Sequence, residues 1–219
     1  MDENVIVALE KRGVVSATFR KLEPVKKKTI YKVVLAAFAE DIFESVSLEK
    51  VALAAGISKG SLIQYFMHKG NLLEFAGGIF LDDYRRHWDN YFMTEYAVRA
   101  KDRIANFMAA HLDYWDNAKT EFKFFMKIHY ENSADLTKGI RNEFLKLRSG
   151  YFSQIIGRGM ETGEIRRDME TEFISLLILA SLKNLEQIYA AALQTPKTKV
   201  DLKDLAAKTV MILFDGIGG

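Results

Sequence analysis

The sequence has no cysteine, and among its 219 residues it has only two prolines and 14 glycines. The missing cysteines exclude disulfides and thiolate metal sites. So few helix-breaking residues over this length favour long helices over a many-stranded β structure. The chain is 49% hydrophobic and 27% charged, which is an ordinary globular composition with enough apolar mass for a sizeable core.

A long hydrophobic run is also missing. The longest strongly apolar stretch, residues 173–182, is interrupted by Ser175 and Ser181 and is far shorter than the roughly 20 residues of a membrane span. No basic segment followed by an apolar one opens the chain, so no signal peptide is expected. We therefore expect a cytoplasmic protein with no membrane partner.

Signatures of catalysis are missing as well. The sequence contains no G-x-S-x-G, P-loop, H-E-x-x-H or G-x-G-x-x-G pattern. Asp83 and His87 lie one helical turn apart, but two side chains are too few for a metal site. We expect no enzyme activity, catalytic residue, metal or cofactor.

The most informative stretch is Ser47–Lys69, which predicts two short helices joined by a tight turn. Ser47 and Ser58 are good N-caps for the two helices. Gly56 stands where the chain needs a residue that tolerates a positive φ, and Ile57 can fill the angle between the helices. Two helices with a short glycine-containing turn are typical of the helix-turn-helix motif, whose second helix enters the major groove of DNA.

A basic segment precedes this motif, with Glu23 as its one acid. Its basic residues are Arg20, Lys21, Lys26, Lys27, Lys28 and Lys32. Such a run is usually a solvated surface, but beside a helix-turn-helix a contact with DNA phosphates is the better interpretation. A helix with one apolar stripe is predicted from about Lys26 to Phe43, and it would complete a three-helix domain.

From Ile30 to Leu73 the sequence resembles the DNA-binding domain of the TetR/AcrR family of transcriptional regulators. The residues that carry the resemblance are Ala37, Phe38-Ala39-Glu40, Phe43, Ser47, Val51-Ala52, Ala55-Gly56-Ile57-Ser58-Lys59-Gly60-Ser61-Leu62, Tyr65-Phe66, Lys69 and Leu72. The chain departs from the family at Ile42, Ile63 and Gly70, where the family usually has glycine, tyrosine and an acid. These departures concern the operator sequence more than the function.

The second helix of the motif carries the candidate DNA-binding residues. Lys59 can reach guanine or phosphate, Gln64 can pair with adenine, and Gly60 lets the backbone approach closely. The resemblance implies phosphate contacts as well. The predicted DNA-binding residues are Ser47, Ser58, Lys59, Gly60, Ser61, Gln64, Tyr65 and Lys69. The alternative is an ordinary solvated surface, with Tyr65 part of the core.

The middle of the chain is rich in aromatic residues, which could enclose an apolar ligand pocket with a few polar groups. The predicted pocket residues are Trp88, Tyr91, Phe92, Phe107, His111, Tyr114, Trp115 and Phe125. The alternative is that these rings simply form the core. The resemblance implies a small-molecule effector, and an aromatic lining suits a hydrophobic compound or an organic cation.

The last two predicted helices carry broad apolar faces. The predicted dimerisation residues are Phe173, Leu177, Asn184, Leu185, Leu205, Thr209, Ile212 and Leu213. Two helices from each of two subunits would form a four-helix interface, as the family does, although the same faces could pack within the chain. A dimer also suits a palindromic operator, since one short helix reads few base pairs.

These observations predict an all-α protein of about nine helices. We expect a basic N-terminal extension over residues 1–25, a helix-turn-helix domain over 26–70, and a helical ligand-binding and dimerisation domain over 71–219. The expected helices beyond the motif are 69–94, 102–119, 121–132, 136–162, 171–194 and 202–217. The predicted function is a ligand-responsive, homodimeric DNA-binding regulator that acts as a repressor, the family's commoner role, and is released by a small hydrophobic molecule. The alternative is a hydrophobic-ligand carrier with a vestigial helix-turn-helix.

Overall fold

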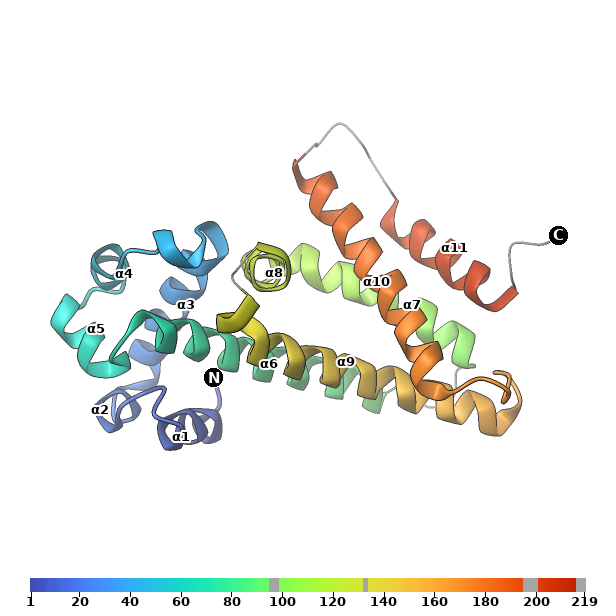
Figure 1. The fold of residues 1–219 in the computed structure, drawn as a ribbon, viewed down its shortest axis with the longest axis horizontal. Helices are drawn as coiled ribbons and strands as arrows, with labels where there is room; N and C mark the ends of the chain where they lie inside the picture. The colour runs from blue at the N-terminus through green and yellow to red at the C-terminus, as the bar shows by residue number, and fades with distance from the viewer. Residues whose placement is uncertain (95–98, 132–133, 195–200, 216–219) are drawn as a thin grey trace. The chain divides into compact units, whose positions relative to one another are not determined.

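The computed structural model describes residues 1–94, 99–131, 134–194 and 201–215, and these residues form eleven α-helices and no strand (Figure 1). The all-α prediction is confirmed. The chain divides into two compact units. Unit 1 comprises residues 1–90 and 118–144, and unit 2 comprises residues 91–117 and those from 145 onward. The expected helix ends at Asn132 and Ile217 lie outside the described residues.

Unit 1 contains the helix-turn-helix and the helices around it. Its elements are α1 (Glu3–Lys11), α2 (Ala17–Arg20), α3 (Pro24–Glu40), a 3-10 turn (Phe43–Ser45), α4 (Leu48–Ala54), α5 (Lys59–Phe66), most of α6 (Lys69–Met93), α8 (Lys119–Met126), a π-helical turn (Lys127–Glu131) and the start of α9 (Ala134–Thr162). This unit extends beyond the predicted boundary at residue 70, because α8 packs along α3.

The first 25 residues are not the extension that the sequence predicted. They form α1 and α2, the two helices beyond the expected nine. Asp2 and Ser16 cap these helices with their side chains. Ile6 and Phe19 are completely buried, and Leu9 is nearly so. These apolar residues complete the core of unit 1.

Two adjacent glycines, Gly77 and Gly78, allow close packing on α6, which continues through both. A Cβ atom on Gly77 would lie 2.3 Å from Cδ1 of Ile140. A Cβ atom on Gly78 would lie 3.2 Å from Cδ2 of Leu9. The missing side chains therefore let α9 and α1 approach α6 closely.

Unit 2 is a helical layer built on α7 (Ala100–Asn117). The rest of α9, α10 (Thr171–Gln194) and α11 (Leu202–Asp215) complete it, and both α10 and α11 pack on α7. Gly163 ends α9 with a φ of 81°, and the N–H of Ile165 donates to the carbonyl of Gly159 at 3.0 Å. This turn is a helix C-cap of the kind that favours glycine.

Gly159 should tolerate no side chain. A Cβ atom there would lie 2.8 Å from Cδ1 of Ile165 and 2.9 Å from Cβ of Ala100. We expect Gly159→Ala to lower the free energy of unfolding by about 1–3 kcal/mol through overpacking. Gly157 is the matched control, because nothing lies within 4 Å of a Cβ atom there. Gly157→Ala should raise stability by about 0.5–1 kcal/mol in the same urea titration; equal effects of the two substitutions would contradict the packing argument.

Helix α10 is long and apolar enough to cross a membrane by length and composition, which the interrupted run at residues 173–182 did not indicate. One such helix is weak evidence, because core helices pass the same test. Along α10 a buried face that includes Ile178, Leu182 and Glu186 alternates with an exposed face that includes Phe173 and Leu177. This periodicity is that of an amphipathic helix packed on one side.

Candidate nucleic-acid interface

The turn between α4 and α5 has the geometry that the sequence predicted. Ser47 is the N-cap of α4, and its Oγ accepts from the N–H of Lys50 at 3.4 Å. Ser58 is the N-cap of α5, and its Oγ accepts from the N–H of Ser61 at 3.0 Å. Gly56 has a φ of +65°, in the left-handed region. Both predicted caps and the glycine turn are therefore confirmed.

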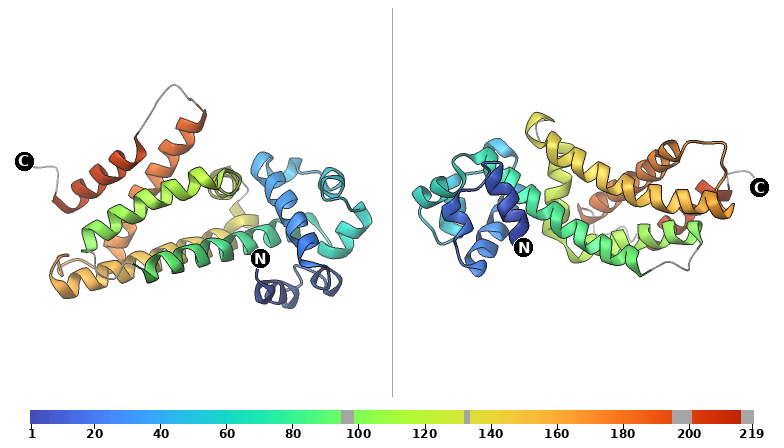
Figure 2. Two further views of the ribbon diagram at one scale, coloured as in Figure 1. Left: turned by 180° about the vertical axis from the view of Figure 1, so that it is seen from behind. Right: turned by 90° about the horizontal axis from the view of Figure 1, so that it is seen from below.

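Helix α5 presents one open face. Leu62 and Phe66 are buried against the rest of unit 1, whereas Lys59, Gly60 and Gln64 are exposed. Figures 1 and 2 show α4 and α5 as neighbours within unit 1. The open face is therefore available to a partner, and its side chains are of the types that contact base edges and phosphates.

The back of α5 is held by the N-terminal helices. The ring of Phe19 lies 4.9 Å from that of Phe66 and 5.9 Å from that of Tyr65. The N–H of Ser16 donates to the carbonyl of Tyr65 at 2.9 Å. The structure thus assigns Tyr65 to the core, the alternative to the predicted surface position. Aromatic packing of this kind fixes the direction in which α5 projects.

Lys69 is tied to its own chain instead of being open to solvent. Its Nζ donates to the carbonyl oxygens of Glu44 at 2.9 Å and Val46 at 3.2 Å, and it lies 4.8 Å from the centroid of the Phe43 ring. These contacts anchor the connection between α3 and α4. In this structure Lys69 braces the connection that precedes α4, and its phosphate contact stays a prediction.

Lys59 forms an ion pair with Glu49 of α4, and both side chains are exposed. The hydrogen bond from Lys59 is the main reason that the pKa of the Glu49 carboxyl lies below its ordinary value, and the charge of Lys59 adds to it. An exposed pair of this kind is weak and exchanges easily. Lys59 is therefore available to an incoming phosphate or base edge.

The link from α5 to α6 contains features that the sequence did not reveal. Met67 has a φ of +62°, which is unusual for a residue other than glycine. Nδ1 of His68 accepts from the N–H of Asn71 at 3.2 Å, and a Cβ atom on Gly70 would lie 3.1 Å from the same Nδ1. A side chain at position 70 would therefore require the His68 ring to shift slightly.

The predicted pocket residues lie in two different packed cores. Trp88 and Phe125 belong to unit 1, and both are buried. Phe92, Phe107 and His111 belong to unit 2 and stack in series, with centroids 5.3 and 5.6 Å apart. The remaining predicted members are Tyr91, Tyr114 and Trp115, also in unit 2. The prediction of one pocket lined by all eight residues is corrected, because their rings fill each other's space as a core does.

A buried polar cluster links α7, α9 and α10 within unit 2, and sequence reasoning identified only its histidine. Nε2 of His111 lies 2.7 Å from Oε1 of Glu186, and the same oxygen lies 3.1 Å from Nη2 of Arg148. His111 and Glu186 are completely buried. Nearby, the hydroxyl of Tyr189 donates to Oδ1 of Asp116 at 3.0 Å. Burial, followed by this bond, raises the pKa of Tyr189. In the sequence, the presence of Glu186 within the otherwise apolar α10 could have indicated this cluster.

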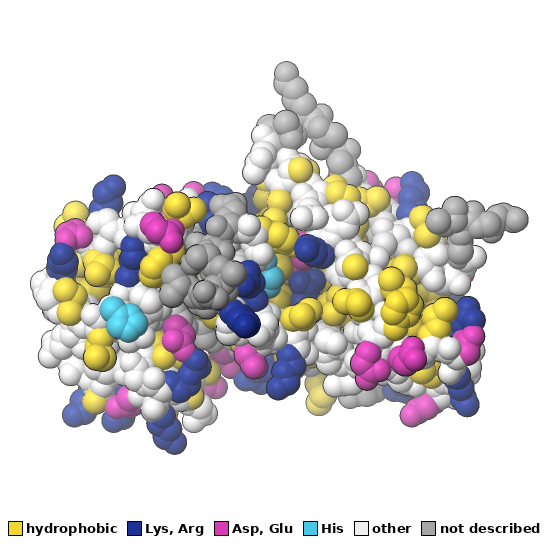
Figure 3. Space-filling view, in the orientation of Figure 1, with side chains coloured by type: hydrophobic (Ala, Val, Ile, Leu, Met, Phe, Trp, Pro, Cys, Tyr) yellow, Lys and Arg dark blue, Asp and Glu magenta, His cyan; other side chains and the backbone are white. Residues whose placement is uncertain are grey.

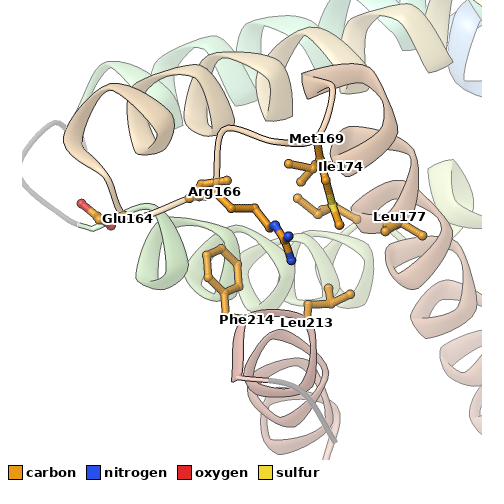
Figure 4. A pocket seen from close by; sticks show the side chains of 9 residues that line it. Glu164, Arg166, Met169, Ile174, Leu177, Leu213 and Phe214 are labelled. Atoms are coloured by element: carbon orange, nitrogen blue, oxygen red, sulfur yellow. The ribbon is translucent and has the colours of Figure 1, made fainter.

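A cavity of about 300 Å³ lies elsewhere in unit 2 (Figure 4). It is lined by Glu164, Ile165, Arg166, Met169, Ile174, Leu177, Ile178, Leu213 and Phe214. None of the eight predicted pocket residues lines it. No sequence pattern indicated it, because its walls come from the connection between α9 and α10, from α10 and from the distant helix α11.

The predicted dimer face is exposed in large part. Phe173 and Leu177 of α10 are 48% and 43% exposed, and Ile212 and Leu213 of α11 are 46% and 37% exposed. Figure 3 shows hydrophobic side chains at the surface of unit 2. Asn184 is exposed, and Leu205 and Thr209 are half-buried. Leu185 is a correction, because it is buried within its own unit and offers no surface to a second copy.

Comparisons with known proteins agree with this geometry. Residues 27–75 match the family model described as "Bacterial regulatory proteins, tetR family". No curated protein matches the sequence. Among solved structures, the transcriptional regulator FadR from Bacillus subtilis in complex with stearoyl-CoA is similar, at 17% identity and a TM-score of 0.71 over 88% of this chain and 100% of that one.

Two further structures have the same fold. The fatty acid degradation regulator FadR from Bacillus halodurans is 19% identical, with a TM-score of 0.71 over 90% of this chain and 98% of that one. A TetR family transcriptional regulator from Chloroflexus aurantiacus is 18% identical, with a TM-score of 0.67 over 92% and 97%.

The exposed helix α5 and its capped turn define a helix-turn-helix DNA-binding protein. The family match shows a DNA-binding domain of the tetR family over residues 27–75, and the resemblance seen in the sequence is confirmed for this part of the chain.

Proposed function

We propose that the protein represses transcription by binding a palindromic operator as a homodimer, and that a small hydrophobic molecule releases it. The observation that carries the DNA-binding part is the open face of α5, where Lys59, Gly60 and Gln64 are exposed while Leu62 and Phe66 anchor the helix from behind. Such a helix reads few base pairs by itself, so specificity favours two copies on two half-sites.

The exposed apolar face of α10 and α11 supports the homodimer. Phe173, Leu177 and Ile212 lie on this face and are each more than a third exposed. Contiguous exposed apolar surface of this kind marks an interaction site in a soluble protein. A symmetric pair of these helices would form a four-helix interface with the same residues on both sides.

The similar structures support a hydrophobic effector. One of them is described as a complex with stearoyl-CoA, and another as a regulator of fatty acid degradation. The effector must bind the released conformation more tightly than the DNA-bound conformation, because equal affinity for both would shift nothing. A change in the separation of the two α5 helices would then remove the match to successive major grooves.

Gln64 provides the test of base reading. We expect Gln64→Ala to relax the base preference at one operator position, at a cost of about 1–3 kcal/mol in operator binding, because an exposed glutamine on the recognition helix pairs with adenine. The measurement is a gel shift with operator variants, starting from DNA that flanks the gene. Gln154→Ala, at an exposed glutamine on α9, is the matched control and should bind like wild type.

The same titration separates the regulator from the carrier alternative. A DNA-binding dimer loses affinity steeply as salt rises, because bound counterions are released from the phosphates. A carrier with a vestigial motif, which Ile63 and Gly70 would favour, should show no salt-dependent operator binding at all. That result would contradict the proposed function.

A further inference from the structure

The recognition helix α5 leaves a large aliphatic side chain open to solvent. Ile63 is 43% exposed, although Leu62, Tyr65 and Phe66 of the same helix are buried in the core of unit 1. Ile63 lies one helical turn after the exposed Lys59, so the two residues share one side of α5. Ile63 therefore adds apolar surface to the face that meets DNA.

Gly60 lies beside Ile63 and leaves the backbone of α5 uncovered. Its φ is not positive, so its conformation is one that any residue adopts in a helix. A Cβ atom there would lie 3.7 Å from Oγ of Ser58, which is an ordinary van der Waals contact. Among the described residues of unit 1, nothing in the packing requires a glycine here, although glycine weakens a helix. The missing side chain instead lets an external surface approach the backbone closely.

Two side chains of different chemistry flank this uncovered backbone. Ile63 and Gln64 follow Gly60 by three and four residues, so both lie beside it on the next turn of the helix. Gln64 is exposed and can pair with N6 and N7 of an adenine in the major groove. An A·T base pair also displays the thymine C5-methyl group in that groove. An isoleucine beside a glutamine therefore suits both halves of an A·T pair.

The other groups that DNA displays suit Ile63 less well. An isoleucine side chain has no hydrogen-bond donor or acceptor, so it can satisfy neither a phosphate nor a polar base edge. Covering such a group without a hydrogen bond costs free energy. The edges of a G·C pair present only donors and acceptors for readout in the major groove, whereas the thymine methyl group is apolar.

We propose that Ile63 determines operator specificity by packing against the C5-methyl group of a thymine, in the same base pair as the adenine read by Gln64 or in the adjoining one. This inference deepens the proposed function and rests on it, because it requires an operator. It also gives a role in DNA reading to the residue that otherwise favours the carrier alternative.

The test replaces thymine with uracil in the operator, because the two bases differ only by the C5-methyl group. The full-length protein first selects an operator from random duplexes. Each thymine is then replaced at the equivalent position of both half-sites, and binding is measured by fluorescence anisotropy. At one position the replacement should weaken wild-type binding about fifteenfold, which is about fourfold for each of the two methyl contacts.

Two variants assign the contact to its residue. Ile63→Ala should bind the thymine and uracil operators equally, because it lacks the side chain that contacts the methyl group. Leu145→Ala is the matched control, since it removes an exposed aliphatic side chain from α9 in unit 2, and it should keep the wild-type preference for thymine.

The outcomes separate this inference from the proposed function. Equal wild-type binding to every uracil operator, or an undiminished thymine preference in Ile63→Ala, would overturn the inference and leave operator binding intact. Should Ile63→Ala fail to fold, equal wild-type binding to every uracil operator would still refute the contact. Failure to select any DNA sequence would overturn the proposed function and this inference together.

Discussion

Replacing Glu186 with alanine is expected to lower the free energy of unfolding by about 3–5 kcal/mol, the largest stability effect predicted for this chain. Glu186 is completely buried on α10, and its carboxylate faces both Arg148 of α9 and His111 of α7. Without the carboxylate, the guanidinium remains in a site with almost no access to water. The cost arises from that buried cation far more than from the lost contact itself.

The control variants separate this mechanism from simple loss of packing. Gln187→Ala changes the next residue of the same helix, which is exposed, and should shift stability by less than about 0.5 kcal/mol. The double variant Glu186→Leu, Arg148→Met removes both charges and should recover much of the loss. Urea titrations at one fixed protein concentration provide the measurement. A double variant less stable than Glu186→Ala would show that the pair is not an isolated charge couple.

Placing glutamates at Phe173 and Ile212 together is expected to give a folded monomer whose operator affinity is lower by about a thousandfold or more. Both side chains are nearly half exposed, so a single chain should tolerate the change. In a symmetric dimer, each substitution would bury charge at the interface twice. Binding would then depend on one recognition helix, which retains mainly the contacts to phosphates.

Sedimentation velocity and fluorescence anisotropy with operator DNA test this prediction together. Leu145→Glu is the control, since Leu145 is an exposed leucine on α9 of the same unit but lies outside the α10 and α11 face. It should remain dimeric and bind the operator normally. If the double glutamate variant stays dimeric with full affinity, the two-fold axis passes through another surface.

The helices and the recognition motif could be predicted because their signals are local. Ser47 and Ser58 cap helices with bonds to residues three positions on, and Gly56 supplies a left-handed turn. Hydrophobic periodicity located the nine expected helices, with α10 running from residue 171 to 194 as predicted. The exposed face of α5 followed directly, because Leu62 and Phe66 must turn inward.

Predictions that depended on distant partners were less accurate. The sequence predicted a basic extension over residues 1–25, because no local pattern shows that Phe19 packs against Phe66. The sequence also did not indicate that Lys69 donates to two carbonyls upstream of α4. The aromatic residues of the middle helices were predicted to line one pocket. Composition alone cannot distinguish a ring that lines a cavity from a ring that fills a core.

By itself, the sequence determined the helical class, the helix boundaries to within a few residues and the family of the DNA-binding domain. These properties follow from caps, turn residues and apolar spacing within one or two helical turns. Only the tertiary structure decided that Glu186 meets His111 across 75 positions, and that Arg166 lies over an aliphatic cavity. The physical reason is that burial and ionic pairing depend on which helices meet, and that is set by the packing of the whole chain.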